Sequence, residues 1–406
     1  MSSTALHSLR ESSVLRTKAS DKGQGLAAAS VLITDEHYKH SLGIVRHLGQ
    51  LGARVSVVAN AKDSLVCRSR YCQEAVFSAA PTIEGFVEAT LQAVQRKHYD
   101  LVIPVSYPMT LALARQRAQL IHYTHLELVE SNTIELAGNK VKMTELAGKI
   151  GVPAPRTFAP ASPDEINKGL CELTFPLVIK LRKESPGHPP VRYARNFKEL
   201  QNLLAGESFS ESEAPLLQEF IPGSGCGFFA TYQKGVCKRV FMHRRVREYP
   251  ATGGVSSCAE SFYDPKLEAY GRRMLDALEW HGVAMVEFRQ DSRDGDYKLM
   301  EVNPKFWCSL DLALAAGADF PGDLCQMALG KSLPFVAEYR RNLRFHWPLS
   351  GSGDLFHLWT RPTSLFHVVS DILDPRVRSN VWISDPAPNF EEVRGLVRQL
   401  LRRRNG

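Results

Sequence analysis

Residues 283–304 read VAMVEFRQDSRDGDYKLMEVNP, and this stretch decides how the rest of the chain is interpreted. Two apolar runs flank a turn that contains Asp-Gly, a pair typical of hairpins. Side chains two apart on a strand share a face, so Glu301 and Asn303 point to the same side. In the simplest register Glu287 lies across from them. The pattern therefore predicts a hairpin that presents two carboxylates and an amide on one face.

A face of this kind suits a hard divalent cation. Mg²⁺ prefers oxygen ligands, and at nucleotide sites it keeps its other positions for phosphate oxygens and water. The sequence therefore predicts that Glu287, Glu301 and Asn303 bind Mg²⁺ or Mn²⁺. The alternative is an exposed, salt-bridged face on which Arg289 and Lys298 neutralise the two glutamates.

Residues 29–130 show the alternation of an open α/β domain. A β-branched run begins at Val31, helical spacing follows as far as Gly52, and a second strand covers residues 55–59. A further helix and a buried strand favour a parallel sheet with crossover helices. Residues 1–28 are Ser-rich and lack an apolar segment, so we interpret them as a disordered tail.

Residues 131–330 mix strands and helices in a different way. Residues 139–150 are expected to form a helix, and strand-like runs then cluster towards residue 303. We divide this part into a small lobe, residues 131–215, and a large lobe, residues 216–330. Residues 331–406 show no persistent period, and the sequence assigns them no role.

Two lysines and a cationic segment point to an anionic ligand. Lys180 ends an apolar strand, from which its ammonium group can reach a phosphate. Lys140 lies near the start of the preceding helix. Arg245 and Arg247 precede a glycine-containing loop, and exposed backbone N–H groups in such loops suit anions.

The order of these segments resembles the ATP-grasp superfamily. The matching segments, in chain order, are NK at 139–140, FPLVIK at 175–180, QEFIPG at 218–223, VEF at 286–288 and EVNPKFW at 301–307. No single segment is specific, but their order and spacing together are. The sequences RRVREYPATGG and NPKFWCS are most similar to the branch near the D-aspartate ligases and the carbamoyl-phosphate-synthase-like proteins.

The resemblance implies a fold and a chemistry. The fold is an open, Rossmann-like α/β domain followed by a two-lobed ATP-grasp fold. The chemistry is an ADP-forming ligation, in which ATP and Mg²⁺ activate a carboxylate as an acyl phosphate that an amine then attacks. Two alternatives remain: a carbamoyl-phosphate-type or other carboxylate-phosphorylating enzyme with a non-amine acceptor, and a non-catalytic ATP-binding module.

The resemblance also implies a role for individual residues. The metal ligands would be Glu287, Glu301 and Asn303. The ATP contacts would be Lys140, Lys180, Gln218, Glu219, Phe220 and Ile221. The catalytic residues would be Lys305, which steadies the acyl phosphate, and Arg245 and Arg247, which grip the substrate carboxylate. The substrate loop would comprise Thr252, Gly253, Gly254 and Ser309.

One segment departs from the family pattern, and the role of one pair of arginines stays open. Relatives cover the triphosphate with a Gly-rich loop after the second lysine, whereas residues 182–190 contain one glycine and three prolines. Proline has no N–H to donate, so Lys183 or His188 would have to serve instead. For Arg245 and Arg247 the alternative is surface charge on a mobile loop.

The bulk composition excludes other classes of function. Five of the seven net positive charges lie in residues 1–30 and 390–406, so no basic stripe for nucleic acid is expected. No apolar run approaches the roughly 18 residues that span a bilayer, and the eight cysteines form no CxxC pair. We expect a cytoplasmic enzyme that acts on small-molecule carboxylate and amine substrates and binds neither nucleic acid nor membrane. The oligomeric state stays open, a homodimer included.

Overall fold

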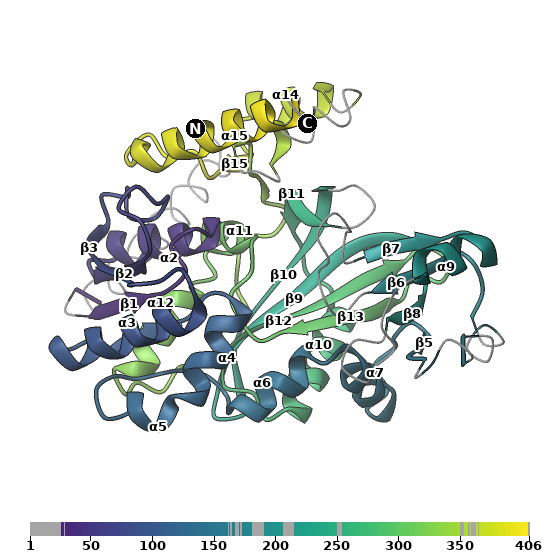
Figure 1. Ribbon diagram of the computed structural model, residues 1–406, viewed down its shortest axis with the longest axis horizontal. Helices are drawn as coiled ribbons and strands as arrows, with labels where there is room; N and C mark the ends of the chain where they lie inside the picture. Colours follow the sequence, from purple (N-terminus) through teal and green to yellow (C-terminus); the bar gives the residue numbers. More distant parts are fainter. Residues whose placement is uncertain are drawn as a thin grey trace, which may run out of the picture.

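The structure of the chain is a computed structural model. It describes residues 26–27, 29–160, 162, 165–166, 170, 173–180, 191–205, 215–249, 254–349, 353–355, 358, 363 and 365–404. The predicted tail falls largely outside these residues, and so do residues 182–190 and the loop residues Thr252 and Gly253. Three β-sheets organise the described part of the chain (Figure 1).

The first sheet is parallel and lies in the N-terminal part, with the strand order β3-β2-β1-β4. Its strands are β1 (Ser30–Ile33), β2 (Arg54–Ala59), β3 (Cys72–Phe77) and β4 (Leu101–Ile103). The helices are α2 (Lys39–Gln50), α3 (Ile83–Arg96), α4 (Tyr107–Arg115) and α5 (Arg117–Leu120). Helix α2 connects β1 to β2 and α3 connects β3 to β4, so the predicted open α/β fold is confirmed. Strand β3 was not predicted from the sequence, because it is a half-exposed edge strand without an apolar run.

The small lobe is built on an antiparallel sheet with the order β5-β8-β6-β7. Its strands are β5 (Thr157–Phe158), β6 (Leu177–Lys180), β7 (Val191–Ala194) and β8 (Leu216–Glu219). Helix α9 (Phe197–Leu204) packs on it through Leu200 and Leu204. Because β8 is hydrogen-bonded within this sheet, the small lobe extends to Glu219, beyond the expected boundary at 215.

The third sheet is the largest and runs β13-β12-β9-β10-β11-β14-β15. Its strands are β9 (Gly223–Gln233), β10 (Val236–Tyr249), β11 (Val255–Ser261), β12 (Gly282–Asp291), β13 (Tyr297–Asn303), β14 (Arg344–His346) and β15 (Arg378–Ser379). The hairpin predicted for residues 283–304 is confirmed as β12–β13, and β9 and β10 form a second antiparallel hairpin. Strands β14 and β15 come from the segment that the sequence left without a role.

Helices from several parts of the chain pack on or near the large sheet. They are α6 (Ser131–Gly138), α7 (Lys140–Lys149), α10 (Pro265–Ala277), α11 (Leu310–Ala315), α12 (Phe320–Ala328), α14 (Leu365–Leu373) and α15 (Pro386–Arg404). The exceptions are α14 and α15, which lie beyond β15 (Figure 1). Met143 and Ala147 of α7 share a core with Val286 and Phe288 of β12. Helices α6 and α7 therefore pack on the large lobe, although residues 131–150 were expected in the small one. No helix in the described residues combines the length and apolar character that a membrane span requires.

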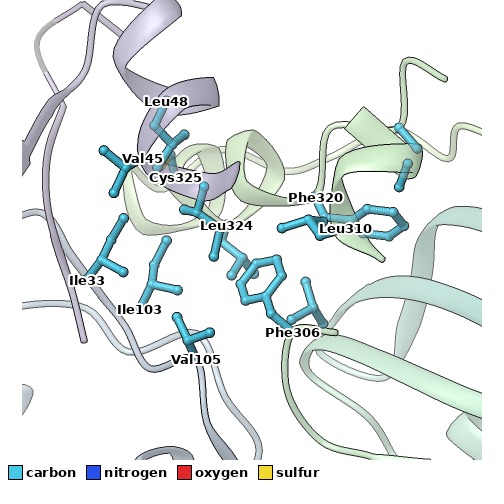
Figure 2. Close-up of a cluster of buried hydrophobic side chains, with 14 of the residues drawn as sticks. Ile33, Val45, Leu48, Ile103, Val105, Phe306, Leu310, Phe320, Leu324 and Cys325 are labelled. Carbon is cyan, nitrogen blue, oxygen red and sulfur yellow. The ribbon is translucent and has the colours of Figure 1, made fainter. Parts of the chain in front are cut away.

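One hydrophobic core joins the N-terminal sheet to the large lobe. Figure 2 shows side chains from both parts packed together. They are Ile33, Val45, Leu48, Ile103 and Val105 from the first sheet and α2, and Phe306, Leu310, Phe320, Leu324 and Cys325 from the chain after β13. Burial of this apolar surface stabilises the junction, so the N-terminal sheet has a fixed position relative to the β12–β13 hairpin.

The C-terminal segment is attached to α2 through a buried arginine. The Arg46 side chain, 2% exposed, donates from Nε to the Asp385 carboxylate at 2.8 Å. Its other nitrogens donate to the carbonyl oxygens of Asn380 at 3.0 Å and Asp385 at 2.9 Å. The guanidinium group also lies 4.9 Å from the ring centre of Trp382. Because a buried charge is tolerated only when it is well paired, this contact fixes residues 380–385 on the N-terminal domain.

A buried glutamate on α15 makes stability depend on pH. Burial raises the pKa of Glu392 from 4.5 to about 7; Arg46 opposes this rise and Asp311 adds to it. The folded chain then binds this proton more tightly than the unfolded chain does, so the free energy of unfolding falls as pH rises from about 4.5 to about 7. We expect Glu392→Gln, which can still accept a hydrogen bond from Asn380, to be more stable than the parent at pH 8 by up to about 3 kcal/mol.

Urea unfolding of Glu392→Gln and the parent at pH 5 and pH 8 measures this effect. The stability difference should be much smaller at pH 5, where the parent glutamate is also largely protonated in the folded state. An equal difference at both pH values would contradict the assignment.

Candidate active site

A cavity of about 580 Å³ lies between the small sheet and the large sheet, and its volume is within the usual range for small-molecule sites. Most of the predicted site residues line it. They are Lys140, Lys180, Gln218, Glu219, Phe220, Ile221, Arg245, Gly254, Glu287, Glu301, Asn303, Lys305 and Ser309. Arg247 is absent from this lining, and Thr252 and Gly253 lie outside the described residues.

The β12–β13 hairpin brings its acidic side chains together. The register pairs Glu287 directly with Glu301, and Met285 with Asn303. Asn303 Nδ2 donates to Glu301 Oε1 at 2.8 Å. The neighbouring side chains of both strands, such as Val286 and Phe288, are buried on the opposite face.

Cations from other elements neutralise the two glutamates. Lys140 Nζ lies 3.2 Å from Glu301 Oε2, and an Arg245 nitrogen lies 2.7 Å from Glu287 Oε1. The alternative partners have other contacts: Arg289 donates to the carbonyl oxygen of Gly223, and Lys298 lies 2.8 Å from Asp294. The face is therefore not the exposed, locally salt-bridged surface of the alternative interpretation.

The electrostatics of the pair reflect burial and close charges. Burial raises the pKa of Glu287, with Arg245 opposing the rise and Glu301 adding to it. Burial also acts to raise the pKa of Glu301, but Lys140, the Asn303 hydrogen bond and Lys180 outweigh it and lower the value to about 2. Nearby positive charge favours the ionised form of two carboxylates that lie close together.

The donor set fits Mg²⁺. Two carboxylates and the Asn303 amide are hard oxygen donors, and Asn303 uses its N–H group on Glu301, which leaves Oδ1 as the donor for a cation. No cluster of three or more His, Cys, Asp or Glu side chains suited to a metal occurs among the described residues. An ion at this hairpin would therefore depend on the amide oxygen and on ligands from a bound substrate.

Two lysines face the same cavity from different lobes. Lys180 is at the end of β6, and Lys140 is the first residue of α7, capped by Asn139. The Asn139 side chain accepts from the backbone N–H groups of Val141 and Lys142, both at 3.1 Å. Burial lowers the pKa of Lys180 to about 8, and the charge of Lys140 contributes. An anionic ligand between the lysines would relieve this repulsion.

The end of the cavity beside β8 is more apolar. Gln218 Nε2 donates to Thr157 Oγ1 at 2.8 Å, and Ile221 is buried. The Phe220 ring meets the Tyr193 ring edge-on, with 6.0 Å between the ring centres. An aromatic ring and a strand edge of this kind suit a flat heterocycle.

The chain is similar in sequence to parts of several curated proteins. No family model matches the sequence. The D-aspartate ligase of Enterococcus faecium is 22% identical over 241 residues, which cover 54% of this chain and 57% of that protein. The chain spans 36–57% of the length of the curated relatives that it matches.

Solved structures decide the fold. The biotin carboxylase of Campylobacter jejuni, in a β,γ-ATP complex, superimposes with a TM-score of 0.64 at 16% identity, over 78% of this chain and 74% of that one. The N5-carboxyaminoimidazole synthetase of Staphylococcus aureus, in complex with ADP, gives a TM-score of 0.60 at 15% identity. The match covers 78% of this chain and 81% of that one. The chain has the ATP-grasp fold.

The ATP-grasp cavity contains a histidine that the sequence analysis missed. His243 lies on β10 with its Nε2 2.6 Å from Ser309 Oγ, and its ring packs 4.7 Å from the ring centre of Phe229. Burial lowers the pKa of His243 to about 3, with Arg245 contributing, so the imidazole is neutral at neutral pH. The period of two could have revealed it, because His243 and Arg245 share a face of the strand.

The same strand explains why the ATP-grasp cavity lacks Arg247. Strand β10 changes register against β11 between Arg245 and Arg247, a β-bulge that turns the second side chain away. Arg247 instead donates to Asp354 at 2.6 and 3.0 Å and to Asp371 at 2.5 Å. Both arginines are on a strand and largely buried, not on a mobile loop. Arg247 is thus not positioned to grip a substrate in the cavity.

Proposed function

We propose that the chain is a Mg²⁺-dependent, ADP-forming ligase that activates a carboxylate as an acyl phosphate and couples it to an amine. One observation carries this proposal: the carboxylates of Glu287 and Glu301 and the ammonium groups of Lys140 and Lys180 converge on one cavity between two lobes. Relatives named D-aspartate ligase and carbamoyl-phosphate synthase support it.

In this proposal the two lobes divide the work of binding ATP. Lys140 and Lys180 bind the phosphate oxygens, and the strand end at 218–221 contacts the adenine. Glu287, Glu301 and Asn303 hold Mg²⁺, for which Mn²⁺ could substitute. When bound, this ion offsets the negative charge of the phosphates and of the transferring phosphoryl group.

The opposite end of the cavity receives the acid. Lys305 is available for this role, because its Nζ has a long contact of 3.4 Å with the Phe306 carbonyl oxygen. Ser309 supplies a hydroxyl that the neutral His243 orients, and Gly254 contributes backbone. Arg245 is already paired with Glu287, so it acts on the substrate through its charge. Thr252 and Gly253 stay predictions.

The proposed reaction has two bond-making steps. A carboxylate oxygen of the acid attacks the γ-phosphorus of ATP and ADP leaves, which gives an acyl phosphate. The amine nitrogen then attacks the acyl carbon, and phosphate leaves with the oxygen that joined the two. The cationic side chains of the cavity would stabilise the negative charge that develops in both steps. We place this activity in the cytoplasm, supported by the seven free cysteines of the described residues.

Product analysis tests the proposal. The purified chain is incubated with ATP, Mg²⁺ and pooled amino acids and other carboxylates, and the products are identified by mass spectrometry. We expect ADP and phosphate to form only when an acid and an amine are both present, with a product equal to their sum less water. Release of AMP and pyrophosphate would contradict acyl-phosphate chemistry. ATP binding without turnover across the panel would favour a non-catalytic module.

A further inference from the structure

The C-terminal helices expose a large apolar surface. Of the 21 exposed large hydrophobic side chains in the described residues, 11 lie between residues 365 and 401. Ile383 is 94% exposed, Phe366 78% and Phe390 71%. Figure 1 places α14 and α15 along one edge of the molecule, beyond α2 and β15. Contiguous exposed apolar patches on a soluble domain mark interaction sites.

Helix α15 is amphipathic, and its apolar side faces outward. Its exposed apolar residues, spaced by three and four along the helix, are Phe390, Val393, Val397 and Leu401. This spacing gives one continuous stripe. The inward side is attached by Glu392, which accepts from Asn380 Nδ2 at 3.1 Å. The residues of the stripe keep 41–71% of their surface exposed, so this side of α15 is open to solvent.

Basic side chains flank the stripe. Arg394 and Arg398 are exposed on α15, and the sequence continues with three arginines at 402–404. The acids of the helix are already engaged: Glu391 lies 2.9 Å from Arg394 and 3.8 Å from Arg68, and Glu392 is buried. The outward face of α15 thus combines apolar and positive groups.

We propose that α15, together with the exposed Ile383 before it, binds an anionic lipid surface. An arginine-rich helix with Phe, Val and Leu on its exposed face can lie in the interface of a bilayer and bury that face among headgroups and acyl chains. Negative headgroups complement the arginines. Such a helix needs no apolar run of spanning length, so the proposal revises the expectation that the chain does not bind membranes, which was based on the lack of such a run.

Other occupants fit the surface less well. A protein groove that encloses a helix would need access to most of its circumference, whereas the Arg46–Asp385 and Glu392–Asn380 contacts fix one side of α15. If a second copy of this chain bound through the same face, the arginines of one α15 would face those of the other. No exposed, unpaired acid of α15 would lie between them to neutralise the charge. A bilayer requires only the one exposed face.

The proposed lipid site is separate from the cavity. None of the residues that line the cavity comes from α14 or α15. The inference therefore does not depend on the ligase proposal, and lipid binding can be measured without ATP or substrates.

Co-sedimentation of the full chain with vesicles tests the inference. We expect binding to vesicles of phosphatidylcholine mixed with phosphatidylserine, little binding to phosphatidylcholine alone, and weaker binding at high salt. Each arginine near an anionic surface contributes about fivefold to the binding constant, so Arg394→Gln with Arg398→Gln should weaken binding about 25-fold. Val393→Ser with Val397→Ser should weaken it at least about tenfold.

A matched control separates the stripe from general surface hydrophobicity. Val236→Ser removes a side chain that is 56% exposed at the β9–β10 turn and should leave lipid binding unchanged. Unfolding curves show whether each variant is folded before its binding is compared. Three results would overturn the proposal: equal binding to both vesicle types, binding that both α15 double variants retain, and a dimer that the valine substitutions dissociate in a chain without vesicle binding.

Discussion

Glu301→Gln should reduce ADP formation by about 10²–10³-fold, the usual cost of losing one group that stabilises charge in a transition state. The substitution keeps the size of the side chain and its hydrogen-bonding capacity towards Asn303, but it removes the negative charge. It also leaves Lys140 and Lys180 facing each other without that charge. We therefore expect both weaker use of Mg²⁺ and a slower chemical step.

Initial rates of ADP release over a range of Mg²⁺ concentrations measure this effect. The variant should need more Mg²⁺ for half-maximal rate, and saturating Mg²⁺ should restore only part of the rate. Glu260→Gln is the matched control: Glu260 is on the same sheet, paired with Arg244 at 2.6 Å, and outside the cavity lining. Unchanged rates in Glu301→Gln would remove this residue from the metal site.

Arg247→Met should destabilise the folded chain by about 3–5 kcal/mol, the range seen when one partner of a buried ion pair is removed. The Arg247 guanidinium group bridges Asp354 and Asp371, whose side chains are 0% and 4% exposed. Methionine fills similar space but leaves both carboxylates with less positive charge. His346 remains 3.1 Å from Asp354, and Arg344 remains 3.0 Å from Asp371, so the loss is partial.

Urea unfolding of Arg247→Met and of Arg244→Met tests this interpretation. Arg244 pairs with Glu260 from a side chain that is 52% exposed, and exposed pairs contribute at most about 1 kcal/mol. Burial acts to raise the pKa of Asp354, but its hydrogen bonds with His346 and Arg247 outweigh this and lower it. The penalty of Arg247→Met should therefore decrease towards acid pH, where protonation of Asp354 removes the charge that Arg247 neutralises. Equal and small effects for the two arginines would show that the bridge does not support the fold.

Local periodicity predicted the central hairpin well. The alternation of apolar and polar residues led to the prediction that Glu287 lies across from Glu301, and the two residues do pair, although the register shifts by one residue between Phe288 and Glu287. Strand β10 was harder to predict: Arg245 and Arg247 were both expected at the substrate, but only Arg245 lines the cavity. A bulge between them adds a residue on one strand only, and nothing in the local pattern announces it. The lysines at 140 and 180 were easier to predict, because each lies at the end of a helix or strand.

Features that depend on distant partners could not be predicted from local pattern. The period of two places His243 on the same face as Arg245, but its contact with Ser309, 66 positions later, depends on the fold. Strand β14 is three residues long and forms because its backbone pairs with that of β11. Helix α15 has a visible amphipathic pattern, but the pattern does not say which face the protein covers. Contacts with α2 decide that.

The ion pair between Arg46 and Asp385 joins residues that are 339 positions apart. During translation Arg46 is therefore synthesised long before Asp385. Helix α2 lacks the anionic partner of Arg46 until residue 385 has been added. The contact that fixes α2 therefore forms only after residue 385 has been translated. A premature stop codon shortly before position 385 would consequently leave the buried Arg46 without its anionic partner, and the N-terminal domain would lose stability together with the segment that follows it.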